Sequence, residues 1–205
     1  MALAMLHLQG EGVERDPSRA KELLRQAAEG GHAGAALQLG HVYFGKYGVD
    51  AKEVKKGEGV SWYTKAAEAG EAEAQYTLGM LYLNGNGVPA DPAVAANWIE
   101  KAAHNDHAAS QFQLGVMYCT GQGVPKDLPQ AIAWYELAAQ LGHPVAQYNL
   151  AVMVAKGQGC KPDRDKAHSW FQKAAAQGLA AAQTALRDFD GPGRGVLPEE
   201  GKPGS

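Results

Sequence analysis

Residues 82–91 read YLNGNGVPAD, and this stretch decides how the chain is organised. Gly85 and Gly87 flank a single residue ahead of a helix-like segment, a spacing that also occurs in nucleotide-binding turns. The same Gly-x-Gly motif recurs three more times, within residues 10–13, 121–124 and 157–160. A phosphate-binding loop is normally unique in its domain. The four copies therefore indicate a structural turn, in which glycine supplies a positive φ.

The chain follows a repeat of 36 residues around these turns. The tryptophans stand at this interval: Trp62, Trp98, Trp134 and Trp170. A series of leucines has the same spacing: Leu78, Leu114, Leu150 and Leu186. Pairs of alanines keep the same phase, at residues 27–28, 66–67, 102–103, 138–139 and 174–175. Parallel series in one phase indicate a single structural unit that is repeated along the chain.

Each repeat contains the pattern of two helices. Within residues 74–82 the apolar side chains recur at three- and four-residue steps, which indicates one face of a helix. The turn at Gly85 ends this helix. Asp91 and Pro92 then begin the second helix, as its N-cap and its first helical residue. Aspartates at equivalent positions predict the same start in other repeats: Asp16, Asp127 and Asp163.

The helices are expected to persist by stacking on their neighbours, because a single helix of about 13 residues is marginal in water. Small residues such as Gly79 let the backbones approach closely. We predict that the tryptophans fill the space between helices. Replacing a fully buried tryptophan, with Trp98 and Trp134 as the examples, would then cost about 3–5 kcal/mol.

The repeated unit resembles the Sel-one-like repeat family. Residues 74–82 match the first half of that family's motif, and residues 131–139 match the second half. The resemblance covers approximately residues 1–187. It implies an all-α fold, a right-handed α-solenoid of helix-turn-helix repeats related to tetratricopeptide arrays. It also implies a non-enzymatic protein that binds other proteins, with no catalytic residue to carry over.

The predicted organisation is a single solenoid over residues 1–190 and a flexible Gly/Pro-rich tail over residues 191–205. The predicted repeats span 1–32 (partial), 33–71, 72–107, 108–143 and 144–179, followed by a partial terminal helix, 180–190. The second repeat has three extra residues, in a loop predicted from Gly45 to Glu58 that contains Lys52, Lys55 and Lys56. Met1 lies within the predicted first helix, with no capping residue before it. The chain therefore either starts on a partial cap or is a fragment of a longer array, which we favour.

Composition and charge narrow the classes of function. The chain is 45% hydrophobic and 20% charged with a net charge of -3, the balance of a folded soluble protein. Lysines and arginines are scattered, so nothing favours nucleic acid. The apolar stretches are shorter than the roughly 20 residues of a membrane span. Residues 1–6 lack a basic leader and a clear cleavage site, so we expect a cytoplasmic protein, or a periplasmic or secreted one if a longer precursor exists.

Histidines and cysteines do not predict a metal, cofactor or catalytic site. His32, His107 and His143 occupy one position in different repeats, and consecutive repeats place such positions roughly 10 Å apart. Zinc ligands must instead converge at about 2.0–2.1 Å from one ion. Cys119 and Cys160 stand where other repeats have apolar residues, so we expect buried, free and slowly reacting thiols.

The candidate partner-binding surface lies on the first helix of each repeat, which lines the concave face in related solenoids. The residues just before the repeated leucine are polar: Gln38, Thr77, Gln113 and Asn149. The residues two positions after it are mostly apolar: His41, Met80, Val116 and Val152. An extended peptide could hydrogen-bond its backbone to the polar row and lay its side chains on the apolar row.

Two functions remain open at this point. The first is a non-enzymatic scaffold or adaptor that binds a peptide or partner protein in its concave groove. The second is a recruiting or regulatory domain of a larger enzyme or of an envelope or secretion complex, whose chemistry lies outside this chain. An intrinsic hydrolase ranks third, because no nucleophile–base pair stands out from the repeat pattern.

Overall fold

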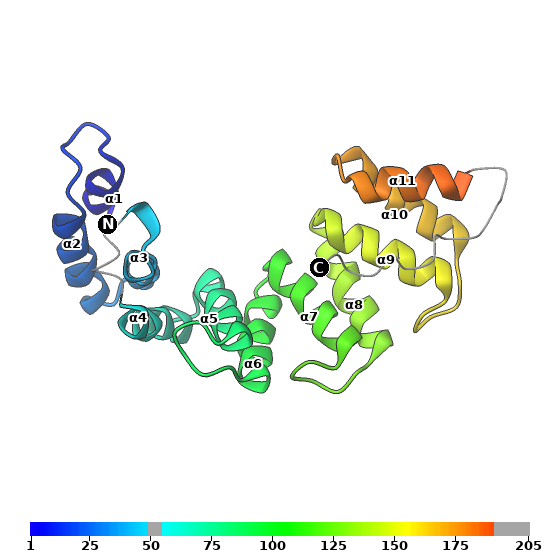
Figure 1. Ribbon diagram of the computed structural model, residues 1–205, viewed down its shortest axis with the longest axis horizontal. Coiled ribbons are helices and arrows are strands. Elements are labelled where there is room, and N and C mark those ends of the chain that lie inside the picture. The colour runs from blue at the N-terminus through cyan, green and yellow to red at the C-terminus, as the bar shows by residue number, and fades with distance from the viewer. Residues whose placement is uncertain (49–54, 191–205) are drawn as a thin grey trace. The chain divides into compact units, whose positions relative to one another are not determined.

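The computed structural model describes residues 1–48 and 55–190, and within these ranges it is all-helical (Figure 1). The helices are α1 (Ala2–Gln9), α2 (Pro17–Glu29), α3 (Ala33–Tyr43), the 3-10 turn η1 (Lys46–Gly48), α4 (Lys56–Glu68), α5 (Ala72–Asn84), α6 (Pro92–His104), α7 (Ala108–Thr120), α8 (Leu128–Gln140), α9 (Pro144–Lys156), α10 (Arg164–Ala176) and α11 (Ala180–Asp190). The predicted all-α class is confirmed. None of these helices has the length and apolarity needed to cross a bilayer.

The helices form two compact units, Met1–His107 (unit 1) and Ala108–Ser205 (unit 2). Within each unit, consecutive helices pack against each other, from α1 to α6 and from α7 to α11. The boundary between the units falls between two predicted repeats. The single solenoid over residues 1–190 stays a prediction, and the predicted tail lies outside the described residues.

The Gly-x-Gly turns are structural, as predicted. Gly85 (φ 66°) and Gly87 (φ 84°) both have the left-handed backbone that glycine adopts without steric cost. The N–H of Gly85 donates to the carbonyl of Leu81, which ends α5. The N–H of Asp91 donates to the carbonyl of Tyr82 at 2.9 Å and closes the turn. Equivalent bonds close the other turns: Asp16 to His7, Asp127 to Tyr118 and Asp163 to Val154.

The predicted aspartate caps are confirmed. The carboxylate of Asp91 accepts from the N–H groups of Ala93 and Val94, both at 3.0 Å. These N–H groups lack partners within their own helix, so the cap satisfies them. The same carboxylate bonds recur at the starts of α2, α8 and α10: Asp16 with Arg19, Asp127 with Gln130, and Asp163 with Lys166.

The loop predicted over residues 45–58 is shorter than expected. Helix α4 already begins at Lys56, with Lys55 as its N-cap. The ammonium of Lys55 lies 3.0 Å from the carboxylate of Glu58, one turn ahead, and Glu58 also places a negative charge in the first turn of the helix. These local interactions extend the helix into the predicted loop. Lys52 lies outside the described residues.

The tryptophans line the edge of the core and do not fill its centre. Trp62, Trp98 and Trp134 are half-buried, and Trp170 alone is buried, with an exposed fraction of 9%. The side chains in the centre belong to the residue that follows each tryptophan, Tyr63, Ile99, Tyr135 and Phe171, which are between 0% and 3% exposed. Full burial, the condition for the predicted cost of about 3–5 kcal/mol, is therefore not met at Trp98 and Trp134, because the neighbouring position, about 100° further around the helix, faces the first helix.

Lysines cover the outer faces of three of these indole rings. The ammonium groups of Lys65, Lys101 and Lys173 lie 3.9, 4.1 and 4.0 Å from the ring centroids of Trp62, Trp98 and Trp170. Each lysine stands three residues after its tryptophan, so the two share one face of the second helix. Such cation–π contacts near the surface contribute about 0.5–1 kcal/mol each.

Close approach of the first helix explains its central glycines. A Cβ on Gly79 would lie 2.5 Å from Cγ1 of Ile99, and one on Gly115 would lie 2.6 Å from the ring of Tyr135. Real Cβ atoms do not approach other atoms so closely, so only glycine fits at these two positions. The expected role of Gly79 in letting backbones approach is confirmed.

Consecutive repeats are joined by buried glutamines that the sequence analysis did not single out. The side-chain amide of Gln75 on α5 donates to the carbonyl of Ala67 on α4 at 3.0 Å. Gln147 on α9 makes the same 3.0 Å bond to the carbonyl of Ala139 on α8. Both glutamines are at most 5% exposed. Each bond gives a second donor to a carbonyl in the last turn of a helix, which also accepts from the backbone N–H of Gly70 or Gly142 at 3.1 Å.

Candidate partner-binding surface

In unit 1 the candidate residues lie on α3 and α5. Gln38 on α3 is half-buried, and its amide oxygen accepts a hydrogen bond from the hydroxyl of Tyr47 in η1. The same oxygen lies 3.4 Å from Nδ1 of His41. Gln38 therefore already uses its acceptor within the chain. Thr77 and Met80 on α5 are half-buried, so part of each side chain reaches the surface.

His41 is almost fully enclosed, contrary to its expected place in a surface row. It is 7% exposed, and its ring meets the ring of Tyr63 edge-on with 5.5 Å between centroids. Burial, followed by the charge of Lys46, lowers the pKa of His41, and the carboxylate of Glu73 opposes this shift. The imidazole is therefore neutral at neutral pH.

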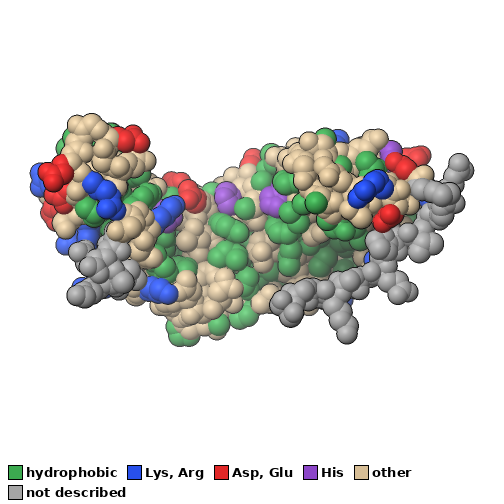
Figure 2. All heavy atoms as spheres, turned by 45° about the horizontal axis from the view of Figure 1, so that its top comes forward, with side chains coloured by type: hydrophobic (Ala, Val, Ile, Leu, Met, Phe, Trp, Pro, Cys, Tyr) green, Lys and Arg blue, Asp and Glu red, His purple; other side chains and the backbone are tan. Residues whose placement is uncertain are grey.

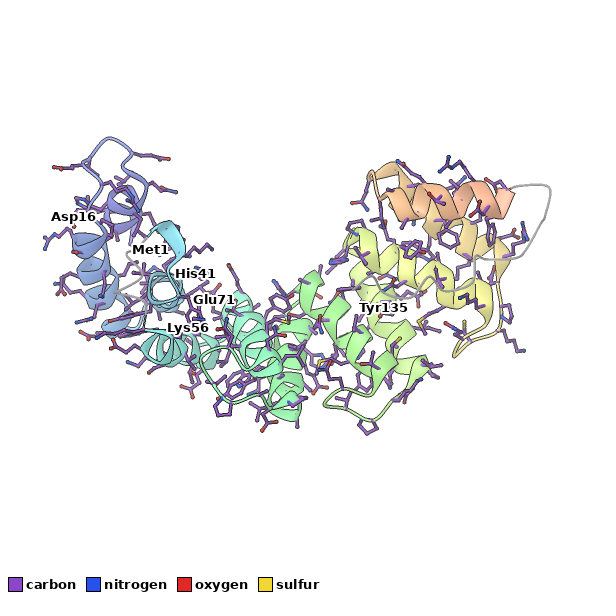
Figure 3. All side chains as sticks on the ribbon, in the orientation of Figure 1. Met1, Asp16, His41, Lys56, Glu71 and Tyr135 are labelled. Carbon is purple, nitrogen blue, oxygen red and sulfur yellow. The ribbon has the colours of Figure 1, made fainter. Side chains whose placement is uncertain are left out.

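In unit 2 the candidate residues lie on α7 and α9. Val116 and Val152 are half-buried and pack against the hydrophobic core of this unit. Gln113 on α7 is half-buried as well. Asn149 on α9 lies near Tyr135, whose place on α8 Figure 3 shows. Burial raises the pKa of Tyr135, and the side chain of Asn149 opposes that rise. Asn149 thus has a structural partner that its sequence position did not reveal.

Both cysteines are free thiols and only half-buried, less than the sequence analysis expected. The thiol of Cys119 lies 3.7 Å from the thioether of Met153. Burial raises the pKa of Cys119, which keeps the thiol protonated and slows its reactions. Among residues 1–48 and 55–190 there is no group of three or more His, Cys, Asp or Glu side chains that could hold a metal ion.

The histidines at the repeated position act as helix caps and ring contacts, a role that the sequence analysis missed. Nδ1 of His143 accepts from the N–H of Ala146 at 3.1 Å, at the start of α9. The ring of His143 also stacks on Phe112, with 4.6 Å between centroids and 14° between planes. His32 makes the same cap at the start of α3. The sequence does contain a signal for this capping role. The histidine position directly precedes each first helix, just as the capping aspartates directly precede each second helix.

Acidification is expected to destabilise the fold through His143. Burial lowers its pKa in the folded protein below the usual value of about 6.5, with a weaker opposing effect from the backbone hydrogen bond. The unfolded chain therefore binds a proton more readily than the folded one. The contribution of neutral His143 to stability is fully present above its unfolded pKa of about 6.5. It is lost as the pH falls through the lower pKa that His143 has in the folded protein. Urea unfolding at pH 7.5 and pH 5.5 would measure it.

His143→Asn keeps an acceptor at the cap but does not titrate, so it should lose less stability than the wild type between these two pH values. His143→Ala removes the cap and should be destabilised at both. His41 and His107, whose pKa values burial also lowers, remain in all three proteins and contribute equally. Equal losses on acidification in the wild type and His143→Asn would contradict the prediction.

Comparison with known proteins gives one family and several similar structures. The model of the Sel1 repeat matches residues 1–32, 33–71, 72–107, 108–143 and 144–179. A protective antigen of uropathogenic Escherichia coli strains that displays an SLR fold is 32% identical with a TM-score of 0.89, and the match covers 97% of this chain and 42% of that one. A Sel1 repeat protein from Oxalobacter formigenes is 32% identical with a TM-score of 0.81, covering 96% and 79%. The comparison with curated proteins found no match.

Proposed function

Since the chain belongs to the Sel1 repeat family, whose members are generally non-enzymatic scaffolds for protein–protein interaction, we propose that it binds a peptide or partner protein along its first helices. The finer form of the proposal is that the partner lies in a concave groove formed by these helices. The cytoplasmic location expected from the sequence stays a prediction.

One observation carries the proposal. Apart from His41, the candidate positions on the first helices are half-buried, although they adjoin fully buried residues. Thr77 and Met80 flank Leu78, which is 1% exposed, and Gln113 adjoins Leu114, which is also 1% exposed. Side chains anchored beside a rigid core lose little additional freedom when a partner binds, and this favours affinity. The polar members can pair with a peptide backbone.

A second candidate function follows from the length of the E. coli antigen. This chain spans 42% of that protein, so an array of this kind also occurs as one part of a larger chain. The recruiting or regulatory domain of a larger protein therefore remains the alternative. Binding through the first helices is common to both candidates.

Gln113→Ala is expected to weaken binding of a partner recovered with the purified chain by about 1–3 kcal/mol, because truncation leaves a partner group unpaired. Asn149→Ala should weaken it similarly, but its position near Tyr135 requires that unfolding be measured in parallel. Calorimetric titration of the recovered partner measures the affinities.

Gln172→Ala on the second helix α10 is the matched control, because Gln172 is an exposed glutamine. Its affinity should equal that of the wild type, and Lys101→Ala on α6 should behave in the same way. If Gln172→Ala abolishes binding while Gln113→Ala does not, the partner lies on the second helices and the proposal fails.

A further inference from the structure

One first helix carries a carboxylate where the others carry small or apolar residues. Glu73 is the second residue of α5, and its side chain is 55% exposed. The equivalent positions of the other first helices in the described ranges hold Gly34, Ala109, Val145 and Ala181. The charge at this position is therefore specific to the repeat 72–107, in unit 1.

A histidine ring lies near this carboxylate, and two tyrosines lie beside that histidine. An Oε1 atom of Glu73 lies 4.0 Å from Nε2 of His41 on α3. Figure 3 shows His41 on α3 and Glu71, two residues before Glu73, at the start of the neighbouring α5. The ring of Tyr63 on α4 lies 5.5 Å from that of His41, and the hydroxyl of Tyr47 in η1 donates to Gln38, three residues before His41.

The negative charge of this carboxylate also acts on a second histidine, His107. The charge of Glu73 opposes the burial that lowers the pKa of His107. The ring of His107 lies 5.1 Å from that of Tyr76, which is on α5 three residues after Glu73. The ring of Tyr76 thus follows Glu73 on α5, and His107 packs against that ring.

The neighbouring rings do not neutralise the carboxylate. His41 is neutral at neutral pH, because burial and Lys46 lower its pKa, and the tyrosines are un-ionised. Lys46 is a cation in the neighbourhood, but it is exposed, and its ammonium lies 5.6 Å from the ring centroid of Tyr47. An exposed carboxylate near neutral rings is complementary to a cation, through charge and through the ring faces.

Glu73 also aligns with the candidate binding residues of its helix. Glu73, Thr77 and Met80 are spaced at i, i+4 and i+7, so they follow one face of α5. Along this face a ligand would meet a carboxylate, then a hydroxyl and then a thioether. Figure 2 shows that acidic side chains reach the surface of unit 1.

We propose that Glu73 binds a lysine or arginine side chain of an extended partner peptide that lies along α5. The hydroxyl of Thr77 then pairs with the peptide backbone, and Met80 contacts an apolar side chain further along the peptide. An acidic side chain at the same place is repelled, so the carboxylate selects among partners. This inference rests on the proposed function, because it names the chemistry of the partner at the same surface.

The probe is a displayed library of random linear peptides, selected in parallel on the purified wild-type chain, on Glu73→Gln and on Glu100→Gln. Glu100 is an exposed glutamate on the second helix α6 and serves as the matched control. Peptides selected on the wild type and on Glu100→Gln should be enriched in Lys or Arg at one position. Peptides selected on Glu73→Gln should lack this enrichment.

A double-mutant cycle then tests the contact directly. One selected peptide is synthesised with its basic residue and with Gln in its place, and both forms are titrated against the wild type and Glu73→Gln by fluorescence polarisation. We expect Glu73→Gln to weaken the basic peptide about three- to tenfold, as for a partly exposed ion pair. The Gln peptide should bind the two proteins equally.

The outcomes separate the two proposals. If Lys and Arg are not enriched, or if Glu73→Gln weakens both peptides equally, the assignment of Glu73 is wrong while binding along the first helices stands. If the library yields no peptide, binding of an extended peptide fails and the assignment fails with it. Enrichment of Asp or Glu on the wild type would likewise overturn the assignment.

Discussion

Phe171→Ala should lower the free energy of unfolding by about 3–5 kcal/mol, the range for a large aromatic side chain removed from a core. Phe171 on α10 is 0% exposed, and its ring lies 5.7 Å from those of Tyr148 and Phe189. These neighbours come from α9 and α11, so a single truncation leaves a cavity between three helices. Urea unfolding monitored by far-UV circular dichroism measures the loss.

Trp134→Ala is the comparison, because it removes a larger ring from the same unit. Trp134 is half-buried, so we expect a smaller loss than for Phe171→Ala, and a smaller one than the tryptophan periodicity alone predicted. A loss for Trp134→Ala as large as that for Phe171→Ala would show that the tryptophans form the core after all.

Gly159→Ala should cost about 2–5 kcal/mol, for two reasons that add. Its φ of 79° is left-handed, which costs a residue with a Cβ about 1–2 kcal/mol. A Cβ there would also lie 2.7 Å from Cβ of Leu128 and 2.8 Å from its backbone carbon, and overpacking of this kind costs about 1–3 kcal/mol. The backbone of α8 cannot move away as the end of a flexible side chain could.

Gly142→Ala separates the two reasons. Gly142 has a φ of 88°, but a Cβ there would meet nothing within 4 Å. It should therefore lose only the conformational part, about 1–2 kcal/mol. Thermal and urea unfolding of both variants provide the comparison. Equal losses would mean that the loop relaxes away from Leu128 and that Gly159 is needed for its φ alone.

Local chemistry made most of the fold predictable. Glycines that end helices and aspartates that begin them act on backbone groups a few residues away, so Gly85 and Asp91 could be assigned from the chain itself. The register of the core could not be assigned in this way. Trp134 and Tyr135 recur with the same period of 36 residues as their counterparts, so periodicity alone does not show which of two adjacent positions faces inward.

The candidate site was less predictable, because its residues have partners outside their own helices. Gln38 bonds to Tyr47 in a segment unique to its repeat, and Asn149 lies near Tyr135 on the preceding helix. Comparing repeat positions shows that a residue is polar, but not whether its polar atoms are already paired. Rows of similar residues do not reveal Glu73, because a specific contact can come from the one residue that departs from its row.

The hydrogen bond from a buried glutamine to the preceding repeat has a consequence for how such a chain can change its length over evolution. Gln147 bonds to Ala139 of the preceding repeat, and Gln183 stands in the same relation to Ala175, with 3.4 Å between donor and acceptor. A tandem duplication of residues 144–179 would therefore place a second Gln147 against the carbonyl of Ala175, and no new hydrogen bond between repeats would have to evolve. Duplication of half a repeat would instead separate donor from acceptor. Recombination in whole multiples of 36 residues thus preserves these hydrogen bonds. The three extra residues of the second repeat come between α3 and α4 in the sequence, before both partners of the Gln75–Ala67 bond.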